Sequence, residues 1–97
     1  MGYSKTVTEH MRLTIVRLLA EAQAYTLNES LLVDLVGEYG FNPSRDRLRT
    51  ELAWLEEQDL IQVDGEKCKV ARLRSRGLDV AKCRVTVPGV KKPNLLD

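Results

Sequence analysis

The order of the periodic segments constrains this chain more than any other feature. Apolar residues recur at spacings of three and four over residues 4–24, 28–39 and 44–58, which predicts three amphipathic helices. A short alternating strand, Ile61-Gln62-Val63, follows at once, and Asp64-Gly65 is the strongest hairpin signal in the chain. Residues 66–73 are then expected to form the return strand. The sequence therefore predicts a mainly α fold with a β-hairpin wing (α+β), the order of a winged helix-turn-helix.

The ends of these elements carry matching signals. Asn28 and Ser44 are expected to cap the second and third helices, and Gly40 suits the left-handed position after the second. Ser75 can cap a last helix over residues 76–83, which would bury Leu78 and Ala81. We expect a stripe of leucines on the inner face of the third helix, with Leu60 closing the core beneath its end.

The return strand has an unresolved register. Val70, Ala71 and Leu73 cannot all lie on one face of a strand, so we expect a bulge or a strand end near Arg72. Beyond it, Pro88-Gly89 and the Lys91-Lys92-Pro93 run are typical of a tail. We therefore expect one domain over residues 1–84 and an extended or flexible tail over residues 85–97.

The first helix is apolar on two flanks. Val7, Met11 and Ile15 lie on one flank, and a second flank carries Leu13, Val16 and Ala20. Such a helix is either deeply buried or shared with a partner subunit. Because the half-sites of DNA are commonly read by two-fold dimers, we expect a homodimer that uses the second flank.

Charge is segregated along the chain although the net charge is only +1. Residues 1–66 hold 6 Lys/Arg against 12 Asp/Glu, whereas residues 67–97 hold 9 Lys/Arg against 2 Asp/Glu. This distribution favours a surface facing a polyanion in the C-terminal third. The alternative is a solvated strand and tail that are merely basic.

The start of the third helix holds the candidate DNA-reading residues. In a helix-turn-helix this segment enters the major groove, and arginine supplies paired donors for guanine or phosphate. The candidates are Ser44, Arg45, Asp46, Arg47, Arg49 and Thr50. The alternative is a solvated face with Arg–Glu pairs such as Arg47 with Glu51. In the wing, Lys67, Lys69 and Arg72 would hold the flanking phosphates, unless they only keep an edge strand soluble.

Other residue types point away from catalysis. Cys68 and Cys83 match no metal-site spacing and are expected to be free thiols, and His10 has no acid or nucleophile near it in the sequence. We expect no enzyme activity, no cofactor, no metal and no membrane span, and a cytoplasmic location. Trp54 lies off the leucine stripe, so it either packs against the wing or C-terminal segment or anchors a partner.

Two resemblances accompany these patterns. The run from Ser44 to Ile61 resembles the recognition helix of DeoR- and ArsR-type winged-helix regulators, with Asp59 in place of their usual Gly. The whole chain more closely resembles small proteins of Mu-like prophages, over Arg12–Ala22, Asn28–Leu32, Ser44–Leu55, Arg76–Ala81 and Val87–Lys91. The resemblance implies a cytoplasmic bacterial protein with a winged-helix fold.

Two functions from different classes remain. The first is a double-stranded DNA-binding protein, a phage-encoded transcriptional regulator or accessory factor. The second is an adaptor in phage assembly or packaging that binds a phage or host protein and has no strong affinity for DNA.

Overall fold

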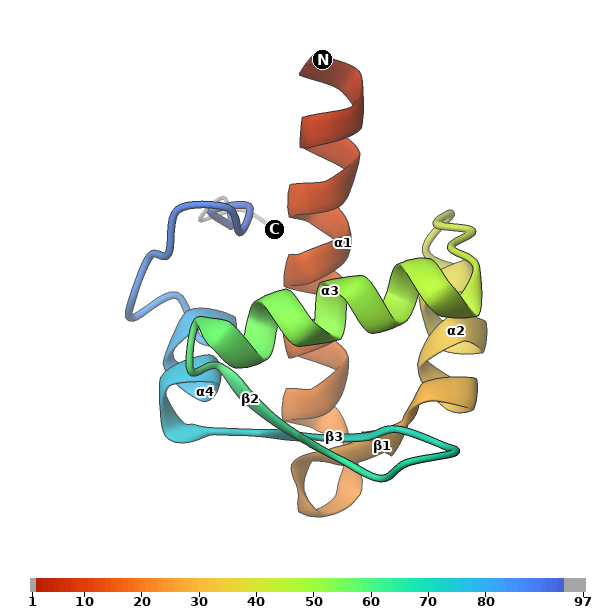
Figure 1. Ribbon diagram of the computed structural model, residues 1–97. Helices are drawn as coiled ribbons and strands as arrows, with labels where there is room; N and C mark the ends of the chain where they lie inside the picture. The colour runs from red at the N-terminus through yellow and green to blue at the C-terminus, as the bar shows by residue number, and fades with distance from the viewer. Residues whose placement is uncertain (1, 94–97) are drawn as a thin grey trace.

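Figure 1 shows the computed structural model, which describes residues 2–93. Within them lie four α-helices and a small antiparallel sheet, an α+β architecture compatible with a winged-helix arrangement. The elements in chain order are α1 (Gly2–Glu21), the 3-10 turn η1 (Gln23–Tyr25), β1 (Thr26–Asn28), α2 (Glu29–Glu38), α3 (Arg45–Glu57), β2 (Ile61–Asp64), β3 (Val70–Leu73) and α4 (Ser75–Ala81).

The expected caps of α2 and α3 are confirmed. The Asn28 carboxamide accepts a hydrogen bond from the Leu31 N–H, and the Ser44 hydroxyl accepts one from the Arg47 N–H. Gly40 has φ +90°, the left-handed conformation predicted for it. The last helix is present at Ser75–Ala81, close to the predicted residues 76–83, but its predicted cap was wrong, since Ser75 lies inside the helix and the N-cap residue Arg74 makes no side-chain capping bond.

The sheet has three strands rather than the two of a hairpin. β3 lies in the middle, with β2 on one side and β1 on the other, all antiparallel. No strand was predicted between the first two helices, yet Thr26–Asn28 pairs with Val70–Arg72. No bulge interrupts the β2–β3 register, in which Val63 faces Ala71. Of the two possibilities predicted near Arg72, the strand end is the one observed. β3 ends one residue later, and Ala71 and Leu73 both point inward.

The wing loop is longer than the tight two-residue turn predicted at Asp64-Gly65. Asp64 belongs to β2 and pairs with Val70, so the loop spans residues 65–69. Gly65 has φ +96° and Asp64 does not have a positive φ, which excludes the type I′ turn that the dipeptide favours. The Lys69 ammonium donates to the Gly65 carbonyl oxygen, 2.9 Å away, and so closes the loop.

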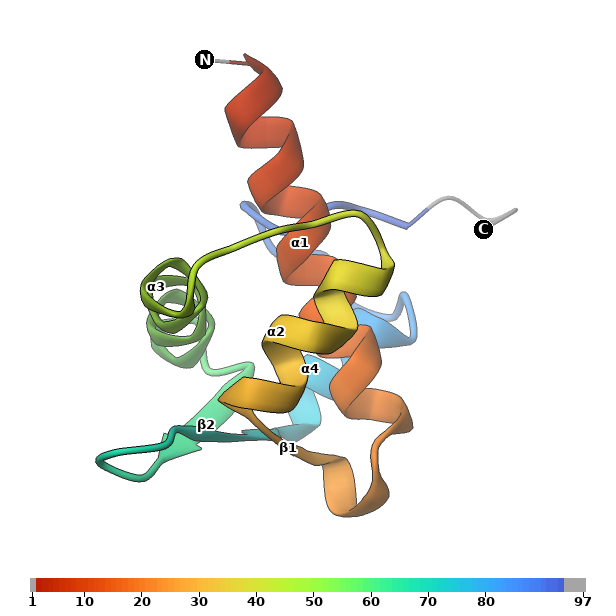
Figure 2. The same cartoon turned by 90° about the vertical axis from the view of Figure 1, so that its right-hand side faces the viewer.

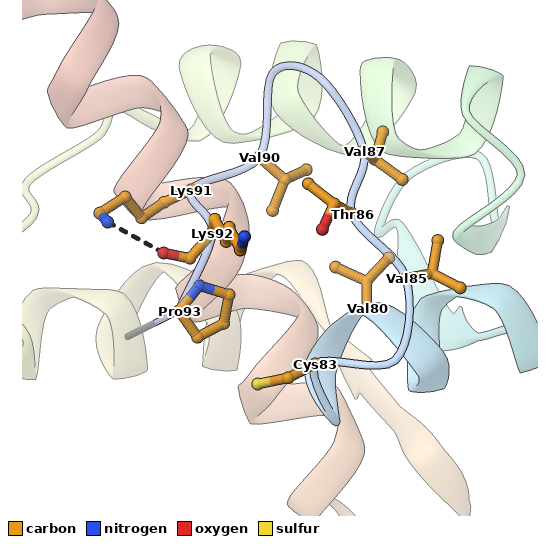
Figure 3. A pocket seen from close by; sticks show the side chains of 9 residues that line it. All are labelled: Val80, Cys83, Val85, Thr86, Val87, Val90, Lys91, Lys92 and Pro93. Atoms are coloured by element: carbon orange, nitrogen blue, oxygen red, sulfur yellow. Dashed lines mark hydrogen bonds between the residues drawn. The ribbon is translucent and has the colours of Figure 1, made fainter. Parts of the chain in front are cut away.

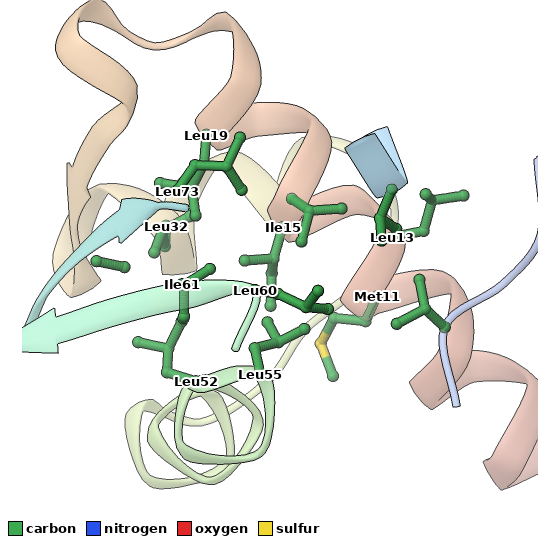
Figure 4. Packing of buried hydrophobic residues seen from close by; sticks show 14 of the residues in the cluster. Met11, Leu13, Ile15, Leu19, Leu32, Leu52, Leu55, Leu60, Ile61 and Leu73 are labelled. Atoms are coloured by element: carbon green, nitrogen blue, oxygen red, sulfur yellow. The ribbon is translucent and has the colours of Figure 1, made fainter. Parts of the chain in front are cut away.

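The core lies where α1 meets α3 and the sheet (Figure 4). α1 passes behind α3 in Figure 1, and the view turned by 90° shows α3 beside it (Figure 2). The leucine stripe of α3 is buried as predicted, at Leu48, Leu52 and Leu55, and so is Leu60. Burial of such side chains contributes about 1.5–3 kcal/mol each. The second flank of α1 is not free for a partner, because Leu13 and Val16 are 5% and 0% exposed within the monomer.

The C-terminal segment has no helix or strand from residue 84 to residue 93, but it is packed. Val87 and Val90 are buried and belong to the core, and the Lys91 N–H donates to the Glu9 carbonyl oxygen of α1. The predicted tail is therefore folded against α1 over these residues, and residues 94–97 lie outside the described part. α4 buries Gly77 and Val80 rather than the predicted Leu78 and Ala81, which are only partly buried.

Candidate nucleic-acid interface

Glu29, the first residue of α2, is a fully buried carboxylate at the meeting point of α2, α3 and the wing. Arg49 donates two parallel hydrogen bonds to it, from Nε to Oε2 at 2.6 Å and from Nη2 to Oε1 at 2.7 Å. Arg45 adds a third from Nη1 to Oε1 at 3.2 Å. This fork geometry is the strongest form of a carboxylate–guanidinium pair, so two candidate base-reading arginines are engaged within the monomer.

The same junction reaches the wing. Arg49 Nη2 donates to the Lys67 carbonyl oxygen at 2.9 Å, and the Glu29 N–H donates to the Lys69 carbonyl oxygen at 2.8 Å. The hydrogen bonds from Arg49, with smaller contributions from the Lys69 backbone and the charge of Arg45, outweigh burial and lower the pKa of Glu29 to about 2. The carboxylate in turn raises the pKa of Arg49. Glu29 is therefore ionised at neutral pH and fixes the wing loop beside α3.

A second buried carboxylate holds the other side of α3. Glu51 is 3% exposed, and its two oxygens accept from Arg12 Nε at 2.7 Å and from Arg47 Nε at 2.8 Å. Arg47 also donates to the Thr8 hydroxyl on α1. The Arg47–Glu51 pair considered as the alternative from the sequence is therefore present, and it links α3 to α1.

The solvent-facing row of α3 differs from the expected arginine-rich surface. Asp46, Thr50, Ala53 and Glu57 recur at helical spacing and are all exposed. The Thr50 hydroxyl bonds to the Asp46 carbonyl oxygen one turn back. Arg45 remains about half exposed, whereas Arg49 leans toward Glu29. α3 therefore contributes less unpaired positive charge to this surface than the sequence indicated.

The basic residues of the wing are less engaged in contacts within the chain. Lys67 and Arg72 are exposed and Lys69 is half-buried, and none of the three forms an ion pair within residues 2–93. Their hydrogen bonds go to neutral oxygens, from Lys69 to the Gly65 carbonyl and from Arg72 to the Gln62 carboxamide. Ser44 is exposed, but its hydroxyl already accepts the hydrogen bond that caps α3.

Sequence reasoning missed that Glu29 and Glu51 are buried, although a signal existed. Glu29 precedes Leu32 and Val36 by three and seven residues. Glu51 follows Leu48 by three residues and precedes Leu55 by four, so it also has helical spacing. Each carboxylate therefore stands on the buried stripe of its helix. A buried charged residue on such a stripe requires a partner of opposite charge.

Trp54 packs against the C-terminal segment, which confirms the intramolecular interpretation. The Arg12 guanidinium lies 3.7 Å from the centre of the Trp54 ring and donates from Nη1 to the Gly89 carbonyl oxygen at 3.0 Å. A Cβ on Gly89 would stand 2.5 Å from the ring, so this close approach requires glycine.

The same segment borders a hollow of about 180 Å³, lined by Val80, Cys83, Val85, Thr86, Val87, Val90, Lys91, Lys92 and Pro93 (Figure 3). The Lys91 ammonium is turned back to the Lys92 carbonyl oxygen rather than into the hollow.

The described residues contain neither a cluster of metal ligands nor a helix that could span a membrane. Cys68 and Cys83 are both exposed free thiols, and no three His, Cys, Asp or Glu side chains between residues 2 and 93 gather as metal ligands. No helix in this range is long and apolar enough to cross a membrane.

Comparison with known proteins gives two relatives. The chain is 44% identical over 88 residues to uncharacterized protein gp26 of Escherichia phage Mu, covering 90% of this chain and 91% of that protein. It is 42% identical over 64 residues to an uncharacterized protein of Haemophilus influenzae, covering 66% of this chain and 62% of that protein's length. No family model matches the chain, and no solved structure matches it.

Proposed function

Because the chain belongs to the family of gp26 of phage Mu, we propose that it is a phage or prophage protein that binds double-stranded DNA. It does so as a winged helix-turn-helix, with α2 and α3 as the motif and residues 61–73 as the wing. The resemblance to DeoR- and ArsR-type regulators supports a role as a transcriptional regulator or accessory factor in the bacterial cytoplasm.

One observation carries this proposal, the hydrogen bond from Arg49 to the Lys67 carbonyl oxygen. It joins the first half of α3 to the wing loop, the two elements that a winged helix presents to DNA. Figure 1 shows the start of α3 and the wing loop at the same end of the molecule. Their fixed spacing supports a preformed surface in which α3 meets the groove and the wing meets the adjacent backbone.

The ion pairs alter the expected balance of contacts. Arg49 can reach a base only by leaving Glu29, whereas Lys67, Lys69 and Arg72 have no carboxylate to leave. We therefore propose that phosphate contacts from the wing supply most of the affinity and that sequence preference is modest.

The homodimer stays a prediction, but it needs another face. Leu13 and Val16 are buried, whereas Leu31 and Tyr39 of α2 are 47% and 61% exposed. A two-fold contact through α2 would bring two α3 helices to one duplex.

The adaptor function is favoured by a different observation, the exposed row of α3. Asp46 and Glu57 place negative charge where a groove-reading helix would face phosphates. A protein partner with a basic surface would suit this row, and the arginines paired with Glu29 and Glu51 would then serve only the fold.

A fluorescence anisotropy titration at several salt concentrations separates the two functions. The probe is a mixed-sequence duplex of about two helical turns. We expect salt-dependent binding, with Lys67→Ala and Lys69→Ala each lowering the salt slope by about one unit. Lys82→Ala, at the end of α4 away from the wing, is the matched control. It should change neither the affinity for the duplex nor the salt slope. Absence of duplex binding at low salt would reject the DNA-binding function and leave the adaptor.

A further inference from the structure

The outer face of the sheet, where β3 leads into α4, carries an open hollow of about 660 Å³. In Figure 1, the end of β3 that leads into α4 lies opposite the wing loop. Its lining consists of Ala24, Tyr25, Asp59, Gln62, Arg72, Leu73, Arg74, Ser75 and Arg76. This volume falls in the range of ligand sites and exceeds what a single ion fills.

Three arginines line this hollow, and the pleat of β3 accounts for the first two of them. Ala71 and Leu73 point into the core, so Arg72 lies on the outer face, opposite Thr26 of β1 and Gln62 of β2. Arg74 follows two residues later on the same side, and Arg76 lies in the first turn of α4.

The charge of these arginines is largely unopposed. The one ion pair recorded there joins Arg74 Nη1 to Asp59 Oδ1 at 3.6 Å, and both side chains are well exposed. Arg72 bonds only the neutral Gln62 carboxamide, and Arg76 has no ion pair within residues 2–93. The arginines of α3 are instead neutralised by buried glutamates, so the hollow holds the more available guanidinium groups.

The rim adds an aromatic ring and an unusual backbone. Tyr25 is 44% exposed beside the arginines. Ala24, Tyr25 and Asp59 have φ of 54°, 57° and 64°, and Cys83 is the only other non-glycine residue with positive φ in residues 2–93. Asp59 adopts this conformation as the residue that ends α3, whereas Ala24 and Tyr25 adopt it in the turn before β1.

We propose that this hollow binds single-stranded nucleic acid, with Arg72, Arg74 and Arg76 on the phosphates and Tyr25 stacked on a base. Arginines interleaved with an exposed aromatic ring are the usual basis of such binding. A paired base has both faces covered by its neighbours, so Tyr25 can stack only on an unpaired one. This surface shares Arg72 with the one proposed for duplex DNA and otherwise consists of different residues.

Anisotropy titrations with a labelled oligothymidine of about ten nucleotides test this. We expect Arg72→Gln and Arg76→Gln each to lower the salt slope by about 0.7. Tyr25→Ala should weaken binding about 5-fold to 100-fold, whereas Tyr25→Phe, which keeps the ring, should bind like the wild type. Asp59→Asn should tighten binding, because it removes the only carboxylate lining the hollow.

Lys82→Gln removes the same charge outside the hollow and is the matched control, and thermal melts confirm that each variant folds. The proposal is overturned if the oligothymidine does not bind at low salt, if Tyr25→Ala binds as tightly as the wild type, or if Lys82→Gln weakens binding as much as Arg72→Gln. Lys67→Ala distinguishes this proposal from duplex binding. It should weaken binding of the duplex and leave binding of the oligothymidine unchanged.

Discussion

Arg49 holds Glu29 in a two-pronged hydrogen bond, with N···O distances of 2.6 and 2.7 Å, at a point where α2, α3 and the wing meet. Removing one member of such a buried pair leaves the other charge without its main partner. The pair therefore decides both the stability of this junction and the availability of Arg49 to any ligand.

The first prediction concerns the pH dependence of stability. The pKa of Glu29 is lowered to about 2 from an ordinary value of 4.5. Its contribution to the free energy of unfolding is fully present above the ordinary value and is lost as the pH falls toward the lowered one. Urea unfolding of the wild type between pH 5 and pH 2, in about half-unit steps, should show this loss.

Glu29→Gln is the control for that prediction. The amide cannot titrate, so the variant should be less stable at neutral pH and should lose less stability on acidification. An equally steep loss in the variant would assign the acid sensitivity to other carboxylates, and the role given to Glu29 would be wrong.

The buried glutamates show what a single sequence can and cannot reveal. Helix spacing places Glu29 and Glu51 on buried stripes, so their burial was predictable. The choice of partner was not, because Arg49 lies 20 residues from Glu29 and Arg12 lies 39 residues from Glu51. Without the fold, the same arginines indicate a DNA-reading face. The helices and the caps of α2 and α3 depend on local contacts and were predicted well.

The strands and the C-terminal segment depend on distant contacts. β1 has only three residues, too few for an alternating pattern to stand out, and it forms because the edge of β3 is open to pairing. Val87 and Val90 flank Pro88-Gly89, which is typical of a tail. They are buried because Arg12 and Trp54 bind the segment at Gly89, a contact that no local pattern indicates.

The second prediction tests that contact. Arg12 joins Glu51, the Trp54 ring and the Gly89 carbonyl oxygen, so Arg12→Ala should lower the free energy of unfolding by about 1.5–3 kcal/mol. Trp54 is the only tryptophan, and its fluorescence should shift to the red as Gly89 leaves the ring. Arg17→Ala, on the same helix and without an ion pair in residues 2–93, should leave the emission unchanged. An unshifted emission maximum in Arg12→Ala would mean that Arg12 does not hold the segment.

The third prediction concerns the end of α3. The Leu60 N–H bonds to the Leu55 carbonyl oxygen and the Asp59 N–H to that of Glu56, a pattern that ends a helix with a left-handed residue. That residue is Asp59, at φ 64°. Asp59→Gly should therefore raise the free energy of unfolding by about 0.5–1 kcal/mol, because glycine adopts this conformation without strain and the exposed Arg74 pair contributes little. Asp59→Ala removes the same carboxylate without relieving strain, and it should not be stabilised. If thermal melts show that Asp59→Ala is as stable as Asp59→Gly, the explanation is wrong.

The last prediction separates the core from an interface along α1. Leu13 was expected to face a partner, but it is buried within the monomer and belongs to the same hydrophobic core as Val87 and Val90. Leu13→Ala should therefore cost about 2–5 kcal/mol of stability, independent of protein concentration, since the cavity opens inside one chain. Leu31→Ala, at an exposed leucine of α2, should cost under about 0.5 kcal/mol in the monomer. If a dimer forms through α2, sedimentation should show that Leu31→Ala weakens it while leaving the melting of the monomer unchanged. A Leu13→Ala variant that keeps its stability but loses self-association would restore the interface on α1 and displace the packing described here.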